Sequence, residues 1–380
     1  MEQVFVTDRL ALMLEHFGAV GDPREGCKVR YPLREVLFLV TCATIAGCDD
    51  CDRIADRGIL HRDFLKEYGK FCFGTPKEDW LRVVLNRIDP ALFEACFTAR
   101  ARGLRPGAAD LIALDGKSLR RSSGTGAQIR PVHLVPARAS TRRLVLAQEP
   151  VKARDSECAA LRAILERLTL RGARVTIDAI ATNPTMAGAV LAGGGDCLLA
   201  LKHNQPALHD EVAAHFEDPA TTGLATVTVT DKDHGRIETP TTTVSLEAGW
   251  LTGDRRHPGE HRFPGLTSLV RSTAEGERMG KISRETRYFI SSAALTPERA
   301  ATAVRSRWGI KSLHWVLDVV FKEDQSRLRR GHGTRNMALV RRLAFNMLRA
   351  GKGKRSIKAA PKAAGWNTET LKAILNDPLR

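Results

Sequence analysis

The spacing of hydrophobic residues changes along the chain and divides it into regions. Up to residue 107 the apolar positions follow a helical period. The segment 35–46 is dense in Leu, Val and Ala, which is typical of a helix buried on most sides. Asp89 and Pro90 predict the N-cap and first position of a helix over 91–100. We therefore predict a helical N-terminal accessory domain over residues 1–107, with a linker at 103–109.

Beyond residue 108, short apolar runs alternate with helical patterns. The short runs predict buried strands, and capping residues mark the helices between them. The predicted order is strands at 111–114, 133–135 and 144–146, a helix ending at Gly172, a strand at 173–177, a helix at 184–192, a strand at 197–201 and a helix at 206–216. This order indicates an α/β core, whose first part we place at 108–218.

Two further patterns follow. Residues 219–292 switch to threonine-rich alternation, which predicts a β-rich insertion. Pro297 then opens a helical pattern that runs through Trp308 and Trp315 to Phe321, which predicts one long helix. We assign the long helix and a following helix to residues 293–350, and a basic helical tail to residues 351–380.

Two strands of the predicted core end on an aspartate. Asp115 follows the run at 111–114, and Asp178 follows the run at 173–177. A single aspartate at a strand end is more often a turn former or helix cap than a functional group. If the two strands are neighbours, at about 4.8 Å, both carboxylates can bind one divalent cation. That is the arrangement used in metal-assisted phosphoryl transfer.

The charge of the chain indicates a polyanionic partner. Lys and Arg total 59 against 43 Asp and Glu, which gives a net charge of +16. Beyond Gln325 there are fourteen basic residues and two acidic ones. Such a cluster either binds phosphates or forms a solvated surface. We predict that the DNA-binding residues of this segment are Arg327, Arg329, Arg330, Arg335, Arg341, Arg342, Lys352, Lys354, Arg355 and Lys358.

Several other functions are disfavoured by the sequence. The cysteines are scattered and no signal peptide is recognisable, so we expect reduced thiols in the cytoplasm. Cys48 and Cys51 have the spacing of zinc ligands but lack a second pair, so two ordinary thiols are the preferred interpretation. The longest apolar run, at 36–47, is shorter than the roughly 20 residues that span a bilayer. We expect no membrane contact.

Two weak motifs do not predict binding sites. The triplet at 116–118 resembles the end of a phosphate-binding loop, but residue 111 is Leu where that loop needs glycine. We therefore predict no nucleotide partner. His203, His209 and His215 recur every six residues, which would place them on different faces of a helix. A metal site there is not expected.

Several segments resemble a known protein family in the same order along the chain. They include IALDGKSLR, VTIDA, GGDCLLALKHNQPALHDEV, HGRIET, RYFISS and LHWVLDVVFKEDQSRLRRG. The chain resembles, over nearly its whole length, the H-repeat-associated family of bacterial insertion-sequence transposases. The resemblance implies a ribonuclease-H-like DDE transposase, in which two aspartates and a glutamate hold two Mg²⁺ or Mn²⁺ ions. Asp115 and Asp178 match the two aspartates.

The resemblance also implies partners and a location. The DNA partner would be double-stranded and would carry the terminal repeats of an insertion sequence, and the protein would be a homodimer on it. The protein would act in the bacterial cytoplasm, with the nucleoid. In a ribonuclease-H-like core the first and fourth strands lie side by side, which agrees with the placement of Asp115 and Asp178.

The third acid of the family is missing. The family has Trp-Gly-Ile-Glu-Asn, one further residue and Leu-His-Trp, whereas this chain is one residue shorter between Trp308 and Trp315. The ligand position falls on Lys311 or on Ile310, depending on the end from which it is counted. Asp318 is a weak substitute, because it lies about 10.5 Å further along the helix than Lys311.

The missing acid predicts an impaired enzyme. The deletion turns the two parts of the helix by about 100° relative to each other, which would mispack Trp308 against Trp315. We expect a DDE transposase whose metal-dependent strand cleavage and transfer is impaired and whose second ion is doubtful. The alternative is a catalytically dead, transposase-derived DNA-binding protein. A weaker alternative is a ribonuclease-H-like nuclease.

Overall fold

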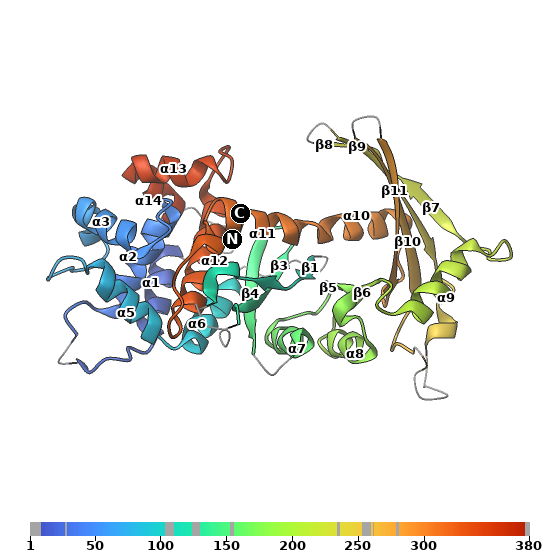
Figure 1. The fold of residues 1–380 in the computed structure, drawn as a ribbon, viewed down its shortest axis with the longest axis horizontal. Coiled ribbons are helices and arrows are strands. Elements are labelled where there is room, and N and C mark those ends of the chain that lie inside the picture. The colour runs from blue at the N-terminus through green and yellow to red at the C-terminus, as the bar shows by residue number, and fades with distance from the viewer. Residues whose placement is uncertain are drawn as a thin grey trace, which may run out of the picture.

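The computed structural model describes residues 9–26, 29–102, 110–123, 130–152, 156–233, 236–252, 260, 262–278 and 281–376. It is a mixed α/β protein built around one large sheet. Figure 1 shows an elongated molecule, with helices at one end, the core sheet in the middle and long β-strands at the other end. Within the described ranges, no helix is long and apolar enough to cross a membrane. The predicted linker at 103–109 lies outside the described residues.

The N-terminal part is helical. Its helices in the described residues are α1 (Arg9–Ala19), α2 (Leu33–Ile45), α3 (Cys51–Leu60), α4 (Arg62–Lys66), α5 (Glu78–Arg87) and α6 (Pro90–Arg102). Nearly every residue of α2 is buried, as its apolar composition predicts. Asp89 Oδ1 accepts a hydrogen bond from the backbone N–H of Ala91 at 2.9 Å, and Pro90 is the first residue of α6. The start of α6 is therefore the one predicted from sequence.

The C-terminal helices share a hydrophobic core with the N-terminal ones. These helices are α12 (Gly333–Gly351), α13 (Ala359–Trp366) and α14 (Thr368–Asn376). Leu339, Leu348 and Ile374 are packed in one cluster with residues of α1, α2 and α5. Figure 1 shows these red helices beside the blue N-terminal ones. The described part of the basic segment beyond residue 351 is thus packed against the N-terminal helices.

The core sheet brings the first and fourth core strands together, as predicted. Its strands are β1 (Leu111–Leu114), β2 (Lys117–Ser118), β3 (His133–Ala139), β4 (Leu144–Val151), β5 (Arg174–Ile177) and β6 (Asp196–Leu201). The order across the sheet is β4-β3-β1-β5-β6. β3 is antiparallel to β1 and β4, whereas β1, β5 and β6 are parallel. Helices α7 (Glu157–Arg167), α8 (Pro184–Ala192) and α9 (Pro206–Glu217) connect the later strands. This arrangement agrees with the predicted ribonuclease-H-like core.

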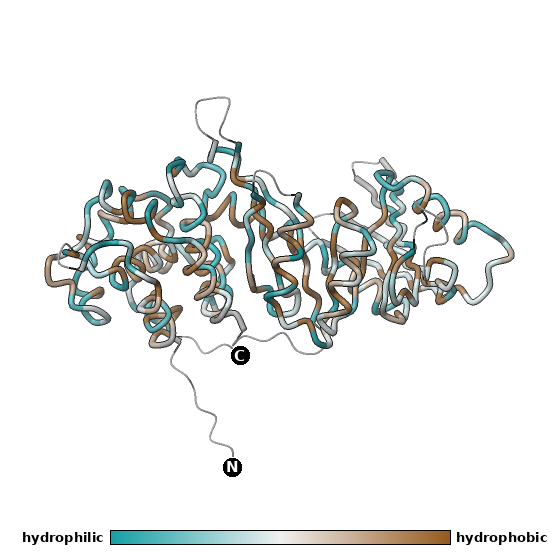
Figure 2. Tube along the Cα trace, turned by 90° about the horizontal axis from the view of Figure 1, so that it is seen from below, coloured by the Kyte–Doolittle hydropathy of each residue, from teal (hydrophilic) through white to brown (hydrophobic). Residues whose placement is uncertain are grey.

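The β-rich insertion continues the same sheet. Its strands are β7 (Ala225–Thr228), β8 (Asp231–Asp233), β9 (Arg236–Ser245), β10 (Ser268–Arg278) and β11 (Lys281–Ser291). β11 pairs with β6 in antiparallel fashion, and β10, β9 and β7 follow outward. The pairing satisfies the backbone of β6, which would otherwise be an exposed sheet edge. Figure 2 shows hydrophobic segments running side by side through the N-terminal helices and the core sheet.

The predicted long helix is divided into α10 (Pro297–Arg307) and α11 (Gly309–Val319). The Trp308 carbonyl accepts hydrogen bonds from the N–H groups of both Lys311 and Ser312, so the turn is tightened there. Glycine, which is a poor helix former, follows at 309. Trp308 and Trp315 are 45% and 53% exposed, and the predicted mispacking of one against the other stays a prediction. The two helices are interrupted only at Trp308.

Candidate active site

Two adjacent strands deliver Asp115 and Asp178 to the same edge of the sheet. All residues of β1 are buried, and most of those of β5 are. The residue that follows the carboxyl end of each strand therefore lies at the edge of the buried sheet. In the parallel register Ala113 lies opposite Thr176. Asp115 and Asp178 each follow two residues later, so they occupy facing positions. The structure therefore places the two predicted acids as the sequence pattern required.

Asp178 is held by two cations. Arg307, the last residue of α10, forms an ion pair with Oδ1 of Asp178. Lys202, which directly follows β6, places its Nζ 3.0 Å from the same oxygen. Burial raises the pKa of this carboxyl, but the charge of Arg307 and the hydrogen bond from Lys202 outweigh burial and hold the pKa below its usual value. Asp178 is consequently ionised and already partnered.

Among the described residues, Asp115 has no comparable partner. The pKa of its carboxyl is raised, mainly because it is buried and then because the charge of Asp178 is near. Lys311 and Arg307 offset only part of this effect. The ring of His314 has Nδ1 at 4.0 Å from Oδ2 of Asp115. Burial and the charge of Arg342 lower the pKa of His314 to about 4, so this ring is neutral and gives Asp115 no counter-charge.

The acid pair fits a divalent cation. Asp115 lacks a full counter-charge, and oxygen ligands of this kind are those that Mg²⁺ and Mn²⁺ prefer. In addition, Nε2 of His314 is buried without a hydrogen-bond partner among the described residues. Arg307 and Lys202 compete with the cation for Asp178. The residues present therefore suit one ion better than two.

The position at which the resemblance led us to expect the family's third acid is cationic. Ile310 is 2% exposed and packs in the apolar cluster beneath α10, so it offers no ligand. Lys311 is exposed, with its ammonium 4.6 Å from the centre of the Trp308 ring. Its charge is felt at Asp115, where it lowers the pKa of the carboxyl. A positive group thus stands on the side from which the family supplies a negative one.

Asp318, the weak substitute, is engaged elsewhere. Its Oδ1 accepts a hydrogen bond from Lys117 Nζ at 2.6 Å. Lys117 is almost fully buried and also contacts Asp324 at 3.2 Å and Glu323 at 3.7 Å. Glu323 in turn pairs with Arg342, and both side chains are 0% exposed. Asp318 belongs to this closed network, so the structure does not bring it to the acid pair.

The predicted DNA-binding residues differ widely in exposure. Arg341 and Arg342 are 1% and 0% exposed, so they do not present their guanidinium groups to DNA, and their prediction as DNA-binding residues is wrong. Charge alone gave no sign of this burial. Arg335 is half-buried and pairs with Glu94 at 3.2 Å. The others lie at the surface, with Lys352 partly covered: Arg327, Arg329, Arg330, Lys352, Lys354, Arg355 and Lys358.

The sequence interpretation missed residues around the acid pair. Arg307 and Lys202, the two partners of Asp178, were not predicted to take part. Lys202 stands at the end of a strand parallel to β5, so the strand order could have indicated it. Glu157 and His133 also lie beside residue 116 and were not singled out. Neither has a distinctive motif of its own.

Two of the three spaced histidines meet, contrary to the prediction. His203 lies in the turn before α9, and its ring centre is 4.3 Å from that of His209. Ligand atoms of His203, His209 and Asp210 all lie within 4.8 Å of one another. His215 is apart and contacts Ser245. The even spacing misled because His203 precedes the helix.

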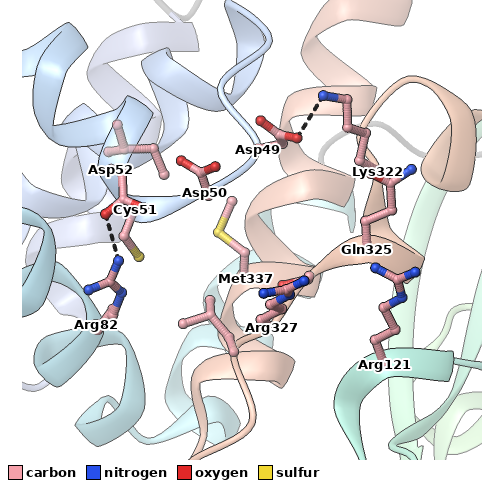
Figure 3. A pocket seen from close by; sticks show the side chains of 13 residues that line it. Asp49, Asp50, Cys51, Asp52, Arg82, Arg121, Lys322, Gln325, Arg327 and Met337 are labelled. Atoms are coloured by element: carbon pink, nitrogen blue, oxygen red, sulfur yellow. Dashed lines mark hydrogen bonds and ion pairs between the residues drawn. The ribbon is translucent and has the colours of Figure 1, made fainter.

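A separate pocket of about 540 Å³ lies between the N-terminal helices and the segment after α11. Figure 3 shows Asp49, Asp50 and Asp52 on one side of it, with Lys322 and Arg121 on the other. Lys322 reaches Asp49 at 2.9 Å across the pocket. Both acidic and basic side chains line this pocket, and the acid pair does not.

Comparison with known proteins agrees with the geometry. Residues 106–347 match the family described as "Transposase DDE domain", and residues 14–100 match "DDE_Tnp_1-associated". The chain belongs to the DDE transposase family. Its relatives include "H repeat-associated putative transposase YhhI" of Escherichia coli strain K12, which is 32% identical over 350 residues, 89% of this chain and 90% of that protein.

Two further similarities complete the comparison of this DDE transposase. "Uncharacterized protein in dhlA 3'region" of Xanthobacter autotrophicus is 36% identical over 285 residues, 74% of this chain and 94% of that protein. A structure of a piggyBac transposase synaptic complex with hairpin DNA aligns with a TM-score of 0.46 and 12% identity, over 98% of this chain and 79% of that one. The family's general use of divalent metal ions agrees with the chemistry of the acid pair.

Proposed function

We propose that this DDE transposase cleaves and transfers the DNA strands of a bacterial insertion sequence with impaired efficiency, using one divalent cation at Asp115 and Asp178. The single observation that carries this proposal is the facing placement of the two aspartates at the ends of β1 and β5. The impairment follows from Lys311, whose positive charge stands where the family supplies a ligand. The protein acts in the bacterial cytoplasm, with the nucleoid.

The chain's own groups define what the site does. A bound Mg²⁺ or Mn²⁺ supplies the charge that favours attack of water or a DNA 3′-hydroxyl on a phosphodiester. Asp115 and Asp178 offer it carboxylate oxygens. Arg307 and Lys202 keep Asp178 ionised and hold its carboxylate in place.

We place the double-stranded DNA of the insertion-sequence ends beside this site. The segment after α11 runs against the turn that follows β2, where Arg329 Nε donates to the carbonyl of Arg121 at 2.9 Å. Arg120, Arg327 and Arg330 are exposed on the same two segments. Lys117, two residues after Asp115, forms ion pairs with Asp318 and with Asp324 of the segment after α11. We therefore place DNA bound by these segments near the acid pair. A homodimer on DNA would hold both ends of the element.

A DNA-binding protein without catalysis is the second candidate. The observation that favours it is the number of cations around two carboxylates, since Arg307, Lys202 and Lys311 all act on the pair. Such a protein would bind the same DNA through the exposed arginines. A ribonuclease-H-like nuclease would use the same acids without strand transfer, and the reaction products distinguish it.

A cleavage assay on the cognate ends with Mg²⁺ tests the proposal. We expect slow cutting by the wild type and none by Asp115→Asn. A repaired variant, in which Lys311-Ser312 becomes Glu-Asn with one inserted residue, should cut faster, because it restores the family's acid. Binding of DNA with no cutting by the wild type would favour the second candidate. Robust cutting by the wild type, abolished by Asp318→Asn, would contradict the proposed site.

A further inference from the structure

Three side chains with metal-ligand atoms meet where the chain passes from β6 into α9. The ligand atoms of His203, His209 and Asp210 all lie within 4.8 Å of one another. His203 stands in the turn between β6 and α9, whereas His209 and Asp210 belong to the first turns of α9. Among the described residues, no other group of three or more His, Cys, Asp or Glu side chains comes this close together. The group includes neither Asp115 nor Asp178, so it is separate from the acid pair.

The turn that carries His203 is fixed by its other side chains. Three of them bind the segment that follows β5, namely Lys202, Asn204 and Gln205. In the part of the chain that the structure describes, the ring of His203 has no hydrogen-bond or ion-pair partner. It lies against the ring of His209, with 4.3 Å between the two ring centres. The turn is thus held in place by its neighbours, and His203 is left to face α9.

The second imidazole is partly buried and is oriented by its surroundings. The side chain of His209 is 14% exposed, and its ring packs edge-on against Tyr288, with 5.2 Å between the ring centres. Nδ1 of His209 lies 2.9 Å from Oδ1 of Asp210. These two contacts restrict the orientation of the His209 ring, and a restricted ring loses less entropy when it binds an ion. Asp210 is 70% exposed and adds the negative charge that a cation needs.

The donor atoms identify the class of ion. Two imidazole nitrogens and one carboxylate oxygen suit Zn²⁺ or a similar transition-metal ion, whereas Mg²⁺ and Mn²⁺ prefer sites made of oxygen atoms. Ligand atoms at about 2.1 Å from a tetrahedral ion are about 3.4 Å apart. The observed limit of 4.8 Å is close to this separation, so small rotations of the exposed side chains of His203 and Asp210 complete the geometry.

We propose that His203, His209 and Asp210 form a second metal site, which takes a transition-metal ion of the Zn²⁺ class and joins the turn after β6 to α9. Three protein ligands leave the fourth position of a tetrahedral ion to water. This inference does not depend on the proposed function, because it assumes no ion at the acid pair. Since Lys202 precedes His203 and pairs with Asp178, the ion also fixes the turn that carries one partner of the acid pair.

Calorimetric titration of the full-length protein with Zn²⁺ tests this site. His203→Ala and Asp210→Ala change exposed side chains, so both variants should fold. Each should bind Zn²⁺ more than about 100-fold more weakly, because loss of a group that only hydrogen-bonds a metal ligand already costs about 10–100-fold. The matched control is Glu211→Ala, which removes an exposed carboxylate from the next position of α9 and should leave the affinity unchanged. Asp115→Asn should also keep the ion.

Hydrogen exchange gives the location of the ion. Zn²⁺ should slow exchange at the backbone amides of residues 202–212 in the wild type but not in His203→Ala. Unchanged Zn²⁺ affinity in His203→Ala or in Asp210→Ala would overturn the three-ligand site. An equal loss in Glu211→Ala would also overturn it, because negative charge in general would then explain the binding. Loss of the ion in Asp115→Asn with retention in His203→Ala would overturn it by placing Zn²⁺ at the acid pair.

Discussion

The acid pair and the network around Lys117 use the same chemical groups with opposite results. In the network, Lys117, Glu323 and Arg342 are buried, and each carboxylate has a cation at hand. At the strand ends, Asp178 is paired, but the pKa of Asp115 is raised, because this carboxyl is buried and lies near the charge of Asp178. The first arrangement is closed and joins segments together. The second is incomplete, and an incomplete set of charges can bind a cation.

The largest effect is expected in the closed network. Arg342→Met should lower the free energy of unfolding by about 3–5 kcal/mol, because it leaves the Glu323 carboxylate buried with only the distant ammonium of Lys117, at 3.7 Å. Urea denaturation measures this loss. Adding Glu323→Leu should recover most of it, since the carboxylate that lost Arg342 is then removed as well. If the double variant is as unstable as the single one, packing and not charge pairing explains the loss.

The exposed arginines should make DNA affinity depend on salt concentration, whereas the buried arginines should not contribute to this dependence. Changing Arg327, Arg329 and Arg330 together to Gln should reduce the slope of log affinity for DNA against log salt by about 2.7, at about 0.9 for each phosphate contact. Fluorescence anisotropy with cognate ends at several salt concentrations measures the slope. A slope equal to that of the wild type would show that DNA lies elsewhere.

Replacing the positive charge near the acid pair by a negative one should strengthen cation binding there. Lys311→Glu should raise the affinity for Mn²⁺ about tenfold, because it replaces a repelling charge by an attracting one near Asp115. Calorimetry measures the change. The control is Lys322→Glu, which alters a lysine that pairs with Asp49 and should leave Mn²⁺ affinity unchanged. Equal affinity in wild type and Lys311→Glu would show that Lys311 does not oppose the cation.

The smallest effects should have opposite signs at the two aspartates. The pKa of Asp115 is raised, so its ionisation disfavours the folded state, and Asp115→Asn should increase Tm by about 1–2 °C at pH 7 without metal. The pKa of Asp178 is lowered, so Asp178→Asn should decrease Tm by a similar amount. The stability that Asp178 contributes is complete above the usual aspartate pKa and is lost as pH falls through its lowered value. Equal shifts of one sign would contradict the contrast.

The positions of Asp115 and Asp178 could be predicted from the sequence, because a simple rule gives the place of a residue that follows a buried strand. A buried run followed by an aspartate places the carboxylate at a sheet edge, and the parallel pairing of β1 and β5 followed from the element order. The partners Arg307 and Lys202 could not be found in this way, because nothing local indicates where a long side chain ends. The position of Glu157 against Gly116 depends on the packing of α7, which the sequence does not show.

Charge was the least reliable guide. Arg341 and Arg342 stand in a basic run and were expected at the surface, yet α12 is buried along most of its length. The buried guanidinium of Arg342 is paired with the carboxylate of Glu323, which comes from a different segment of the chain. The sequence of α12 alone does not show this partner. The break at Trp308 was also missed, because helical periodicity does not register a single tightened turn. β11 pairs with β6, so the β-rich insertion and the core form one sheet, although the sequence analysis assigned them to separate regions.

The shared core of the first and last helices has a consequence for synthesis. Residues of α2 are covered by α12 and α13, which are synthesised after the core sheet. The N-terminal helices therefore emerge with an apolar face that stays open until α12 and α13 have been made. A stop codon before residue 333 would remove α12–α14 and leave that face exposed. Such a truncated product should aggregate or be degraded, even though its strands for Asp115 and Asp178 are intact.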